Sequence, residues 1–201
     1  YKEAYNTDVK ALARDISEGI EPFLDKPFAI FGHSMGALIG YELSCELVGM
    51  YGKKPVVFFA SGCRCPQLMS DYKPAINNLP DNEFFRAVKE YNGIDPELFD
   101  SDEYKEYFIP ILRNDFKTVE TYFYEANPLL ECPIRVYCGI NDGKVVKEQI
   151  AKWNEYTSAG FSYAMFAGDH FFINGFTREI CCDIEKSLIN ISEEANEFSY
   201  R

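Results

Sequence analysis

The chain has 201 residues, of which 47% are hydrophobic and 16% aromatic, a composition typical of one globular domain with a sizeable core. Its formal net charge of -12 disfavours binding to nucleic acid or anionic lipid, and its longest apolar runs are too short to span a bilayer. The 7 cysteines show neither disulfide-scaffold nor zinc-site spacing, and only 2 histidines are present. We therefore expect free thiols in a reducing cytoplasm, with neither a metal nor a cofactor.

The first third of the sequence alternates between helical and strand patterns. A helix is predicted from a cap at Asn6 to Asp8 up to about Leu24, because apolar residues recur there at near-helical spacing. A short apolar run then predicts a buried parallel strand, followed by a helix and a second strand. These three elements are Phe28 to Phe31, Met35 to Val48, and Pro55 to Ala60. Their order favours a mostly parallel sheet flanked by helices.

The alternation stops between Cys63 and Pro128, where no strand is evident and helical segments lie near Asp81 to Tyr91 and Tyr104 to Glu125. An insertion of roughly 60 residues is too long for an ordinary connection between strands. The alternation then resumes with a strand, a helix, a strand and a final helix. These are Ile134 to Cys138, Val146 to Tyr156, Phe161 to Phe166, and a helix from about Thr177. We predict a single α/β domain over residues 1–201, with a helical insertion at about 63–128.

A candidate nucleophile lies in Gly32-His33-Ser34-Met35-Gly36, which fits G-x-S-x-G between a predicted strand and a predicted helix. The turn is tight enough that we expect glycine to be required at both Gly32 and Gly36. It would expose Ser34 at the carboxyl edge of the sheet, above a helix N-terminus. The Met35 N–H would then face a developing oxyanion. The alternative is a glycine-rich turn without chemistry.

A serine hydroxyl needs a base to take its proton, and the two histidines are the candidates. His33 adjoins Ser34 on a sharp turn where adjacent side chains diverge, so we expect it to pack beside the site. His170 follows a predicted strand, at the sheet edge where α/β sites form. We predict His170 as the base; the alternative is an exposed bystander.

The residue that orients the base should precede it, because this arrangement has the order serine, acid, histidine. Asp142 lies in a Gly-Ile-Asn-Asp-Gly turn just after the strand from Ile134. After the preceding strand no acid comes before Asp71, and Asp169 adjoins His170 and should point away from it. We predict Asp142; the alternative is an aspartate that only forms the turn.

At this point the sequence resembles the stand-alone type II thioesterases of nonribosomal peptide and polyketide synthases. The resemblance covers nearly the whole chain, and its insertion and final-loop motifs are more specific than the elbow. The motifs are Phe31 to Gly36, Ala60-Ser61-Gly62 with Arg64 and Pro66, Leu79-Pro80-Asp81 with Glu83 and Phe84, Tyr91-Asn92-Gly93, Arg113 to Phe116, Glu120-Thr121-Tyr122, and Gly168 to Phe172.

The resemblance implies an α/β-hydrolase fold and hydrolysis of acyl groups from the phosphopantetheine arms of acyl or peptidyl carrier proteins. It implies the same roles for Ser34, Asp142 and His170, and it makes the insertion a lid. Aromatic and aliphatic lid residues could then line or cover an acyl pocket, the alternative for each being plain helix packing. They are Phe84, Phe85, Leu98, Phe99, Phe108, Ile109, Leu112, Phe116 and Tyr122.

The carrier proteins of these systems are usually acidic, as is this chain, so we expect docking to rely on a local basic rim and on apolar lid surface. Candidates for the rim are Arg64, Lys144 and Lys147. We expect a monomer. Two alternatives share the same residues: a carboxylesterase or lipase, and a non-catalytic module that binds carrier proteins.

The sequence departs from the family at its start. Members begin with a strand and a glycine-rich loop that supplies a second oxyanion N–H, and no such segment precedes Tyr1. Either N-terminal strands are missing from the chain, or half of the oxyanion hole is. We expect the former, because a strand that begins at Phe28 should be central and needs neighbours on both sides.

Overall fold

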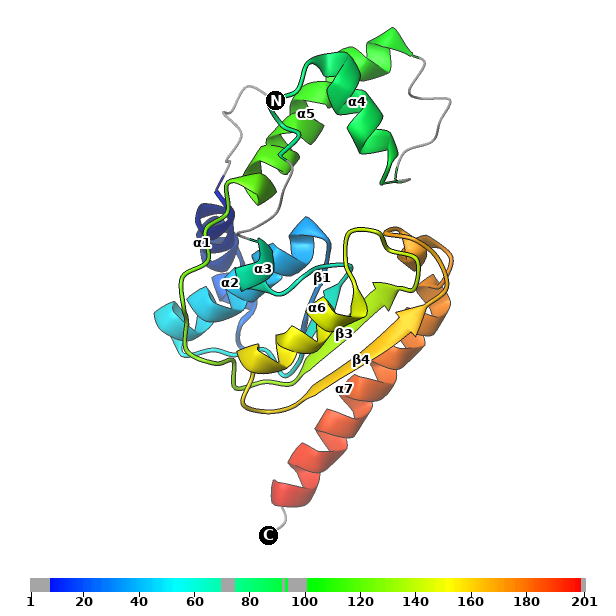
Figure 1. Cartoon of the computed structure of the whole chain (residues 1–201). Helices are drawn as coiled ribbons and strands as arrows, with labels where there is room; N and C mark the ends of the chain where they lie inside the picture. Colours follow the sequence, from blue (N-terminus) through cyan, green and yellow to red (C-terminus); the bar gives the residue numbers. More distant parts are fainter. Residues whose placement is uncertain (1–7, 70–74, 92, 94–100, 200–201) are drawn as a thin grey trace.

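A computed structural model describes residues 8–69, 75–91, 93 and 101–199 of the chain (Figure 1). The strands of the described part form one parallel sheet in the order β1-β2-β3-β4. In register, Ile30 lies beside Phe58, Phe58 beside Ile134, and Ile134 beside Phe161. The strands are β1 (Ile30–His33), β2 (Phe58–Ser61), β3 (Ile134–Gly139) and β4 (Phe161–Phe166). Because all four run the same way, the loops after them meet at one edge of the sheet.

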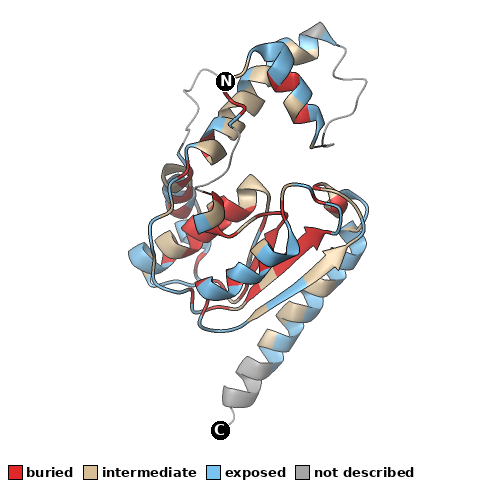
Figure 2. Ribbon diagram, viewed as in Figure 1, coloured by how far each residue is buried: buried red, intermediate tan, exposed pale blue. Residues whose placement is uncertain are grey.

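Successive strand residues point to opposite faces of the sheet, so apolar side chains lie on both faces. Helices cover each face. On one face Val136 packs with Leu38 of α2 and Trp153 of η3, within the cluster that has the most buried residues. Figure 2 shows the buried residues concentrated in the central strands β2 and β3 and on the helix surfaces that face them. On the other face Tyr137 packs with Ile180 of α7. The covering helices are α1 (Val9–Ile20), α2 (Met35–Tyr51), α6 (Lys147–Ala151), the 3₁₀ segment η3 (Lys152–Tyr156) and α7 (Thr177–Ser199).

A polar anchor holds α7 against the sheet. Asp183 accepts hydrogen bonds from Arg135 Nε at 2.9 Å and Nη2 at 3.0 Å, and from Tyr137 Oη at 2.7 Å. Burial works against ionisation of Asp183, but its two partners outweigh burial and lower its pKa. Because Arg135 pairs with Asp183 through two parallel hydrogen bonds, the contact fixes both the rotation of α7 about its axis and its distance from the sheet.

The predicted elements and the observed ones differ mainly at their ends. The first helix ends at Ile20 and a 3₁₀ turn, η1 (Glu21–Phe23), follows, because Pro22 has no N–H to continue the helix. The first strand runs two residues later than predicted, up to His33. The segment predicted as one helix from Val146 divides into α6 and η3.

Strand β1 lies at the edge of the described sheet. Among the described residues it pairs with β2 alone, and the Phe31 side chain is 45% exposed. The second neighbour that the sequence predicts for this strand is not supplied by residues the structure describes. The expectation of strands before Tyr1 stays a prediction.

The predicted lid forms a separate helical layer beyond the carboxyl edge of the sheet (Figure 1). Its helices are α4 (Asp81–Lys89) and α5 (Asp102–Glu120), and α5 is capped by the Ser101 hydroxyl. The short helix α3 (Pro66–Met69), at the start of the predicted insertion, packs instead against the core of the body (Figure 1). Phe84 and Phe85 of α4 pack against Ile109 and Phe116 of α5 in a core of the lid's own. The lid is therefore a small packed unit rather than a loose connection.

Two polar clusters tie the lid together. The Glu120 carboxylate accepts the backbone N–H groups of Ile76 at 2.7 Å and Asn77 at 3.0 Å. Arg113 donates to the carbonyl of Leu79 at 2.8 Å and pairs with Asp81 at 2.6 Å. The backbone N–H and carbonyl groups of the segment leading into α4 thus bond to side chains of α5 instead of to water. These bonds hold the segment to α5.

The lid is joined to the body through Tyr122, which lies two residues after the end of α5. Its hydroxyl donates to Glu42 of α2 at 2.5 Å, and both residues are buried. Burial raises the pKa of Glu42, and the Tyr122 hydrogen bond opposes that rise. Tyr122 therefore packs in the core beneath the lid. It is not among the residues that line the cavity, which was one of the two roles expected for it.

Replacing Tyr122→Phe should lower the free energy of unfolding by about 1–3 kcal/mol, because it removes the Tyr122 donor from the buried Glu42 carboxyl. Urea unfolding would measure the change. The control is Tyr107→Phe on α5, whose side chain is 53% exposed and which should change stability by less than about 0.5 kcal/mol. Equal effects of the two changes would contradict the role given to the Tyr122 hydroxyl.

Candidate active site

Ser34 occupies the turn between β1 and α2 in a strained backbone conformation. Its φ of 53° and ψ of −121° make it the one described non-glycine residue with positive φ. Such a conformation costs about 1–3 kcal/mol and persists only where the surroundings enforce it. Here the Ser34 N–H donates to the Ser61 carbonyl at 2.8 Å, and the Ala37 N–H to the Ser34 carbonyl at 3.0 Å.

The two glycines of the elbow have different roles. A Cβ at Gly32 would overlap the carbonyl group of Gly36 and come within 2.6 Å of the Ala37 nitrogen. A Cβ at Gly36 would meet no atom within 4 Å. The expectation that glycine is required at both positions is therefore wrong for Gly36, because the strand approaches the helix start only on the side of Gly32.

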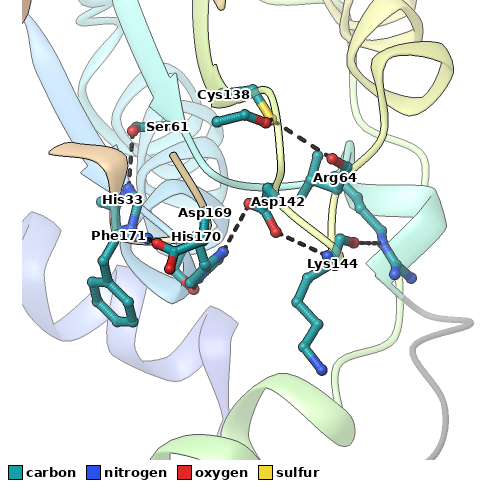
Figure 3. A network of polar contacts seen from close by, with 12 residues as sticks. His33, Ser61, Arg64, Cys138, Asp142, Lys144, Asp169, His170 and Phe171 are labelled. Carbon is teal, nitrogen blue, oxygen red and sulfur yellow. Dashed lines mark hydrogen bonds and ion pairs between the residues drawn. The ribbon is translucent and has the colours of Figure 1, made fainter. Parts of the chain in front are cut away.

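The structure brings the three predicted residues together. His170 Nε2 lies 2.9 Å from Ser34 Oγ. On the other side of the ring, His170 Nδ1 lies 2.9 Å from Asp142 Oδ2 (Figure 3). The side chains of His170 and Asp142 are 7% and 0% exposed. With Nδ1 donating to the carboxylate, the tautomer leaves a lone pair on Nε2 directed at the serine hydroxyl.

Asp142 is held by its own turn and by a neighbouring loop. Its second oxygen, Oδ1, accepts the Lys144 N–H at 2.8 Å, which leaves Oδ2 for the histidine (Figure 3). The loop carrying His170 comes so close to Asp142's own turn that a Cβ at Gly139 would overlap the Asp169 carbonyl. Asp169 itself accepts the Phe171 N–H at 3.0 Å, so it forms the turn beside the histidine.

His33 packs beside the site, as its position in the sequence predicts. Its Nδ1 lies 2.9 Å from Ser61 Oγ, and its ring centre is 5.2 Å from that of His170. Its buried Nε2 makes no hydrogen bond to a described group. Burial first, and then the neighbouring His170, lower the pKa of His33 from 6.5 to about 4. His33 therefore stays neutral at physiological pH.

The first residues of α2 lie beside the nucleophile. Met35 begins the helix, so its N–H has no acceptor within the helix, and it lines the same cavity as Ser34. This is the position in which a backbone donor and the positive end of a helix dipole favour a developing negative charge.

A cavity of about 380 Å³ lies between the lid and the sheet edge and opens onto Ser34 and His170. Of the lid residues proposed to line it, Leu112 and Phe116 are part of its wall. The other lid candidates have other positions. Phe84 is fully buried under Phe116 and the Arg113 guanidinium, and Phe108 stacks on Tyr104 with ring centres 4.1 Å apart.

The remaining lid candidates do not line the described wall either. Phe85 and Ile109 belong to the lid core, and Tyr122 to the core below it. Leu98 and Phe99 lie outside the described residues. For the described residues Phe85, Ile109 and Tyr122, the alternative of plain helix and core packing therefore holds.

Two of the three predicted rim residues border the cavity. Arg64 and Lys144 both line it, and Arg64 Nε donates to the Lys144 carbonyl at 2.7 Å (Figure 3). The Lys144 ammonium lies 4.5 Å from the centre of the Tyr91 ring. Lys147 lies farther out, 5.9 Å from the Tyr163 ring, and is not among the lining residues.

Asp115 is one of the cavity-wall residues to which the sequence reasoning gave no role, and it is the only carboxylate among the described residues of the wall. It lies on α5 between Leu112 and Phe116, which also line the cavity. A signal was present, because Asp115 falls at i+3 from Leu112 and i−4 from Val119, on a helix face otherwise apolar. Without knowing which face of the helix meets the cavity, that spacing could not be interpreted.

A family profile described as "Thioesterase domain" matches residues 1–188. The chain belongs to the thioesterase family. This thioesterase is 38% identical over 191 residues to a protein named linear gramicidin dehydrogenase LgrE, from Brevibacillus parabrevis, covering 94% of this chain and 72% of LgrE. It is 32% identical over 182 residues to thioesterase PikA5 of Streptomyces venezuelae, covering 90% of this chain and 64% of PikA5.

A solved structure extends the likeness to three dimensions. YbtT, described as a type II thioesterase from the yersiniabactin NRPS/PKS biosynthetic pathway, matches this thioesterase with a TM-score of 0.81 at 28% identity. The match covers 92% of this chain and 75% of YbtT. The predicted α/β-hydrolase fold and the predicted likeness to type II thioesterases are confirmed. The thioesterase spans 64% to 75% of the length of these three relatives.

The elbow of this thioesterase predicts opposite outcomes for two matched changes. Gly32→Ala should lower the free energy of unfolding by about 3 kcal/mol or more, because its Cβ meets backbone that cannot move aside cheaply. Gly36→Ala should leave stability unchanged or raise it by up to about 1 kcal/mol through helix propensity. Thermal or urea unfolding would measure both. Similar losses for the two variants would contradict the account of the elbow.

The low pKa of His33 predicts how stability depends on pH. The unfolded chain takes up this proton near pH 6.5 and the folded chain near pH 4, so in that window the unfolded state binds more protons. His33 should therefore cost the folded state up to about 3 kcal/mol as pH falls through the window. Urea unfolding at pH 7 and pH 4.5 should show a smaller loss in His33→Asn. An equal loss would contradict the prediction.

Proposed function

We propose that this protein hydrolyses thioesters through an acyl-enzyme on Ser34. The observation that carries the proposal is the unbroken chain of hydrogen-bond distances from Asp142 through His170 to Ser34, 2.9 Å at each step, at the floor of a cavity. Membership of the thioesterase family supports the same reaction.

In the proposed first half-reaction, Ser34 Oγ attacks the thioester carbonyl and His170 Nε2 takes its proton. The negative charge that forms on the carbonyl oxygen is stabilised by the Met35 N–H and the start of α2. The carbon–sulfur bond then breaks, and the imidazolium returns the proton to the departing thiol. Asp142 holds the imidazole in its tautomer and stabilises the imidazolium throughout.

In the second half-reaction, water takes the place of the serine hydroxyl. His170 Nε2 accepts a proton from the water as it attacks the acyl ester, and returns it to Ser34 Oγ as the acid leaves. A thiolate is a good leaving group, so acylation makes smaller demands on the acid than cleavage of an amide. The proposed reaction needs no cofactor of its own.

We further propose that the substrates are acyl groups on the phosphopantetheine arms of carrier proteins, so that the enzyme edits a synthase. The likeness to YbtT, a thioesterase of an NRPS/PKS pathway, supports this assignment. So do Arg64 and Lys144, which place positive charge at the mouth of the cavity on a chain of net charge -12. Contact with an acidic carrier would depend on this local rim.

The setting of the enzyme is part of the proposal. All 7 cysteines lie in the described part of the chain and are free, which suits a reducing compartment, and we propose the cytoplasm and a monomer. No helix among the described residues is long and apolar enough to cross a membrane. The oxidoreductase reaction in the name of LgrE is not carried over, because the site described here supports acyl transfer.

Ser34→Ala tests the proposal against its two alternatives. Hydrolysis of an acyl-carrier thioester should fall by at least about 10³-fold, and labelling by a fluorophosphonate probe should disappear. The control is Ser192→Ala, an exposed serine on α7 that is not among the residues lining the cavity, which should retain both.

Three outcomes would contradict the proposal. Undiminished turnover in Ser34→Ala would exclude the nucleophile. Faster cleavage of a p-nitrophenyl ester than of the carrier thioester of equal chain length would favour a carboxylesterase. A protein that binds the carrier but neither hydrolyses it nor takes the label would be a binding module.

A further inference from the structure

The lid helix α5 presents one carboxylate to the cavity from an otherwise apolar face. Leu112, Asp115, Phe116 and Val119 all line the cavity, and their spacing of three, four and seven residues places them on one side of the helix. Three of the four are the aliphatic or aromatic residues expected of an acyl pocket. Asp115 is the exception.

Asp115 has no partner among the described residues that would stabilise its charge in this apolar wall. No hydrogen bond or ion pair joins its side chain to another described residue, and burial alone raises its pKa. Two other lid carboxylates are satisfied: Asp81 pairs with Arg113, and Glu120 accepts backbone N–H groups. A carboxylate in an apolar wall costs folding free energy unless something pairs with it.

The two cations of the described cavity wall are already engaged at its rim. Arg64 Nε donates to the Lys144 carbonyl, and the Lys144 ammonium lies 3.6 Å from Glu90 and over the Tyr91 ring. The charge missing from the wall beside Asp115 is therefore a positive one. A substrate can supply it, because the cavity that Asp115 lines is the one that reaches Ser34.

We propose that Asp115 is a specificity-determining residue that selects acyl units bearing an amino group, so that the preferred substrates are aminoacyl thioesters. This inference rests on the proposed function. The ammonium group of the acyl unit donates to the Asp115 carboxylate while the carbonyl lies at Ser34. A charge-assisted hydrogen bond in a largely apolar pocket is among the strong ones. An acyl unit without the amino group would leave the half-buried carboxylate unpaired.

The phosphopantetheine arm offers a second source of donors, its amide N–H groups. Every substrate carries the same arm, so pairing with an amide would help all acyl units equally. Pairing with the acyl amino group would help only those that have one. The two sources can therefore be separated by comparing two acyl groups on one arm.

The test compares alanyl and isobutyryl thioesters of N-acetylcysteamine, which differ by an ammonium in place of a methyl group. The reactions are run near pH 6.5, below the pKa of about 8 of an α-amino group, and corrected for spontaneous hydrolysis. The protein should favour alanyl over isobutyryl in kcat/KM. In Asp115→Asn this ratio should fall on the order of tenfold, mainly through the alanyl substrate. The control is Glu106→Gln, an exposed carboxylate on the same helix, which should leave the ratio unchanged.

The outcomes separate this inference from the function on which it rests. An unchanged ratio in Asp115→Asn, or an equal loss for both substrates, would overturn the selection of amino groups while leaving thioester hydrolysis intact. Hydrolysis of neither substrate by the unmodified protein, together with no labelling of Ser34, would overturn both. Urea unfolding should show Asp115→Asn to be at least as stable as the parent, since it removes an unpaired charge.

Discussion

A line of backbone hydrogen bonds continues past the carboxyl ends of the strands, and the candidate site depends on it. Each loop is tied to its neighbour by one N–H that donates to a carbonyl on the next strand. The bonds are Ser34 to Ser61 at 2.8 Å, Gly62 to Tyr137 at 2.9 Å, and Ile140 to Phe166 at 2.8 Å. Because they extend the ladder of the sheet, the nucleophile, the acid and the base are set in one frame whose spacing is that of parallel strands. Side-chain packing then needs to supply only the final adjustment.

The same frame explains why two imidazoles can lie so close together. His33 and His170 have ring centres 5.2 Å apart, and two positive charges at that separation inside a protein would repel strongly. Burial keeps His33 neutral, with its Nδ1 beside the Ser61 hydroxyl. His170 alone is then left to take up and return a proton. Because His33 stays neutral, it places no positive charge beside His170 when His170 takes up the proton in the proposed reaction.

Much of this arrangement could be predicted from the sequence, because its signals are local. The strand–turn–helix context around Ser34, and the aspartate and histidine directly after two strands, required only motif and order. Features that depend on how two surfaces meet could not be predicted. Gly36 has the same place in the motif as Gly32 but faces open space, and Phe84 looks like a pocket residue until Phe116 covers it. Asp115 belonged to one of the motifs of the resemblance, but its place on the cavity wall was indicated only by a charge on an apolar stripe.

The pair of lid helices α4 and α5 has a hydrophobic core separate from the cores of the sheet. The residues that pack α4 against α5 share no member with the clusters on the two faces of the sheet, and Tyr122 is a buried link between the layers. Changes in free energy at distant sites without shared partners tend to add rather than couple. Substitutions on the lid side of the cavity can accordingly change substrate preference, in evolution or by design. They would do so without changing the stability of the sheet edge that carries the catalytic residues. A library confined to the cavity-facing side of α5 would explore that freedom with the catalytic frame held constant.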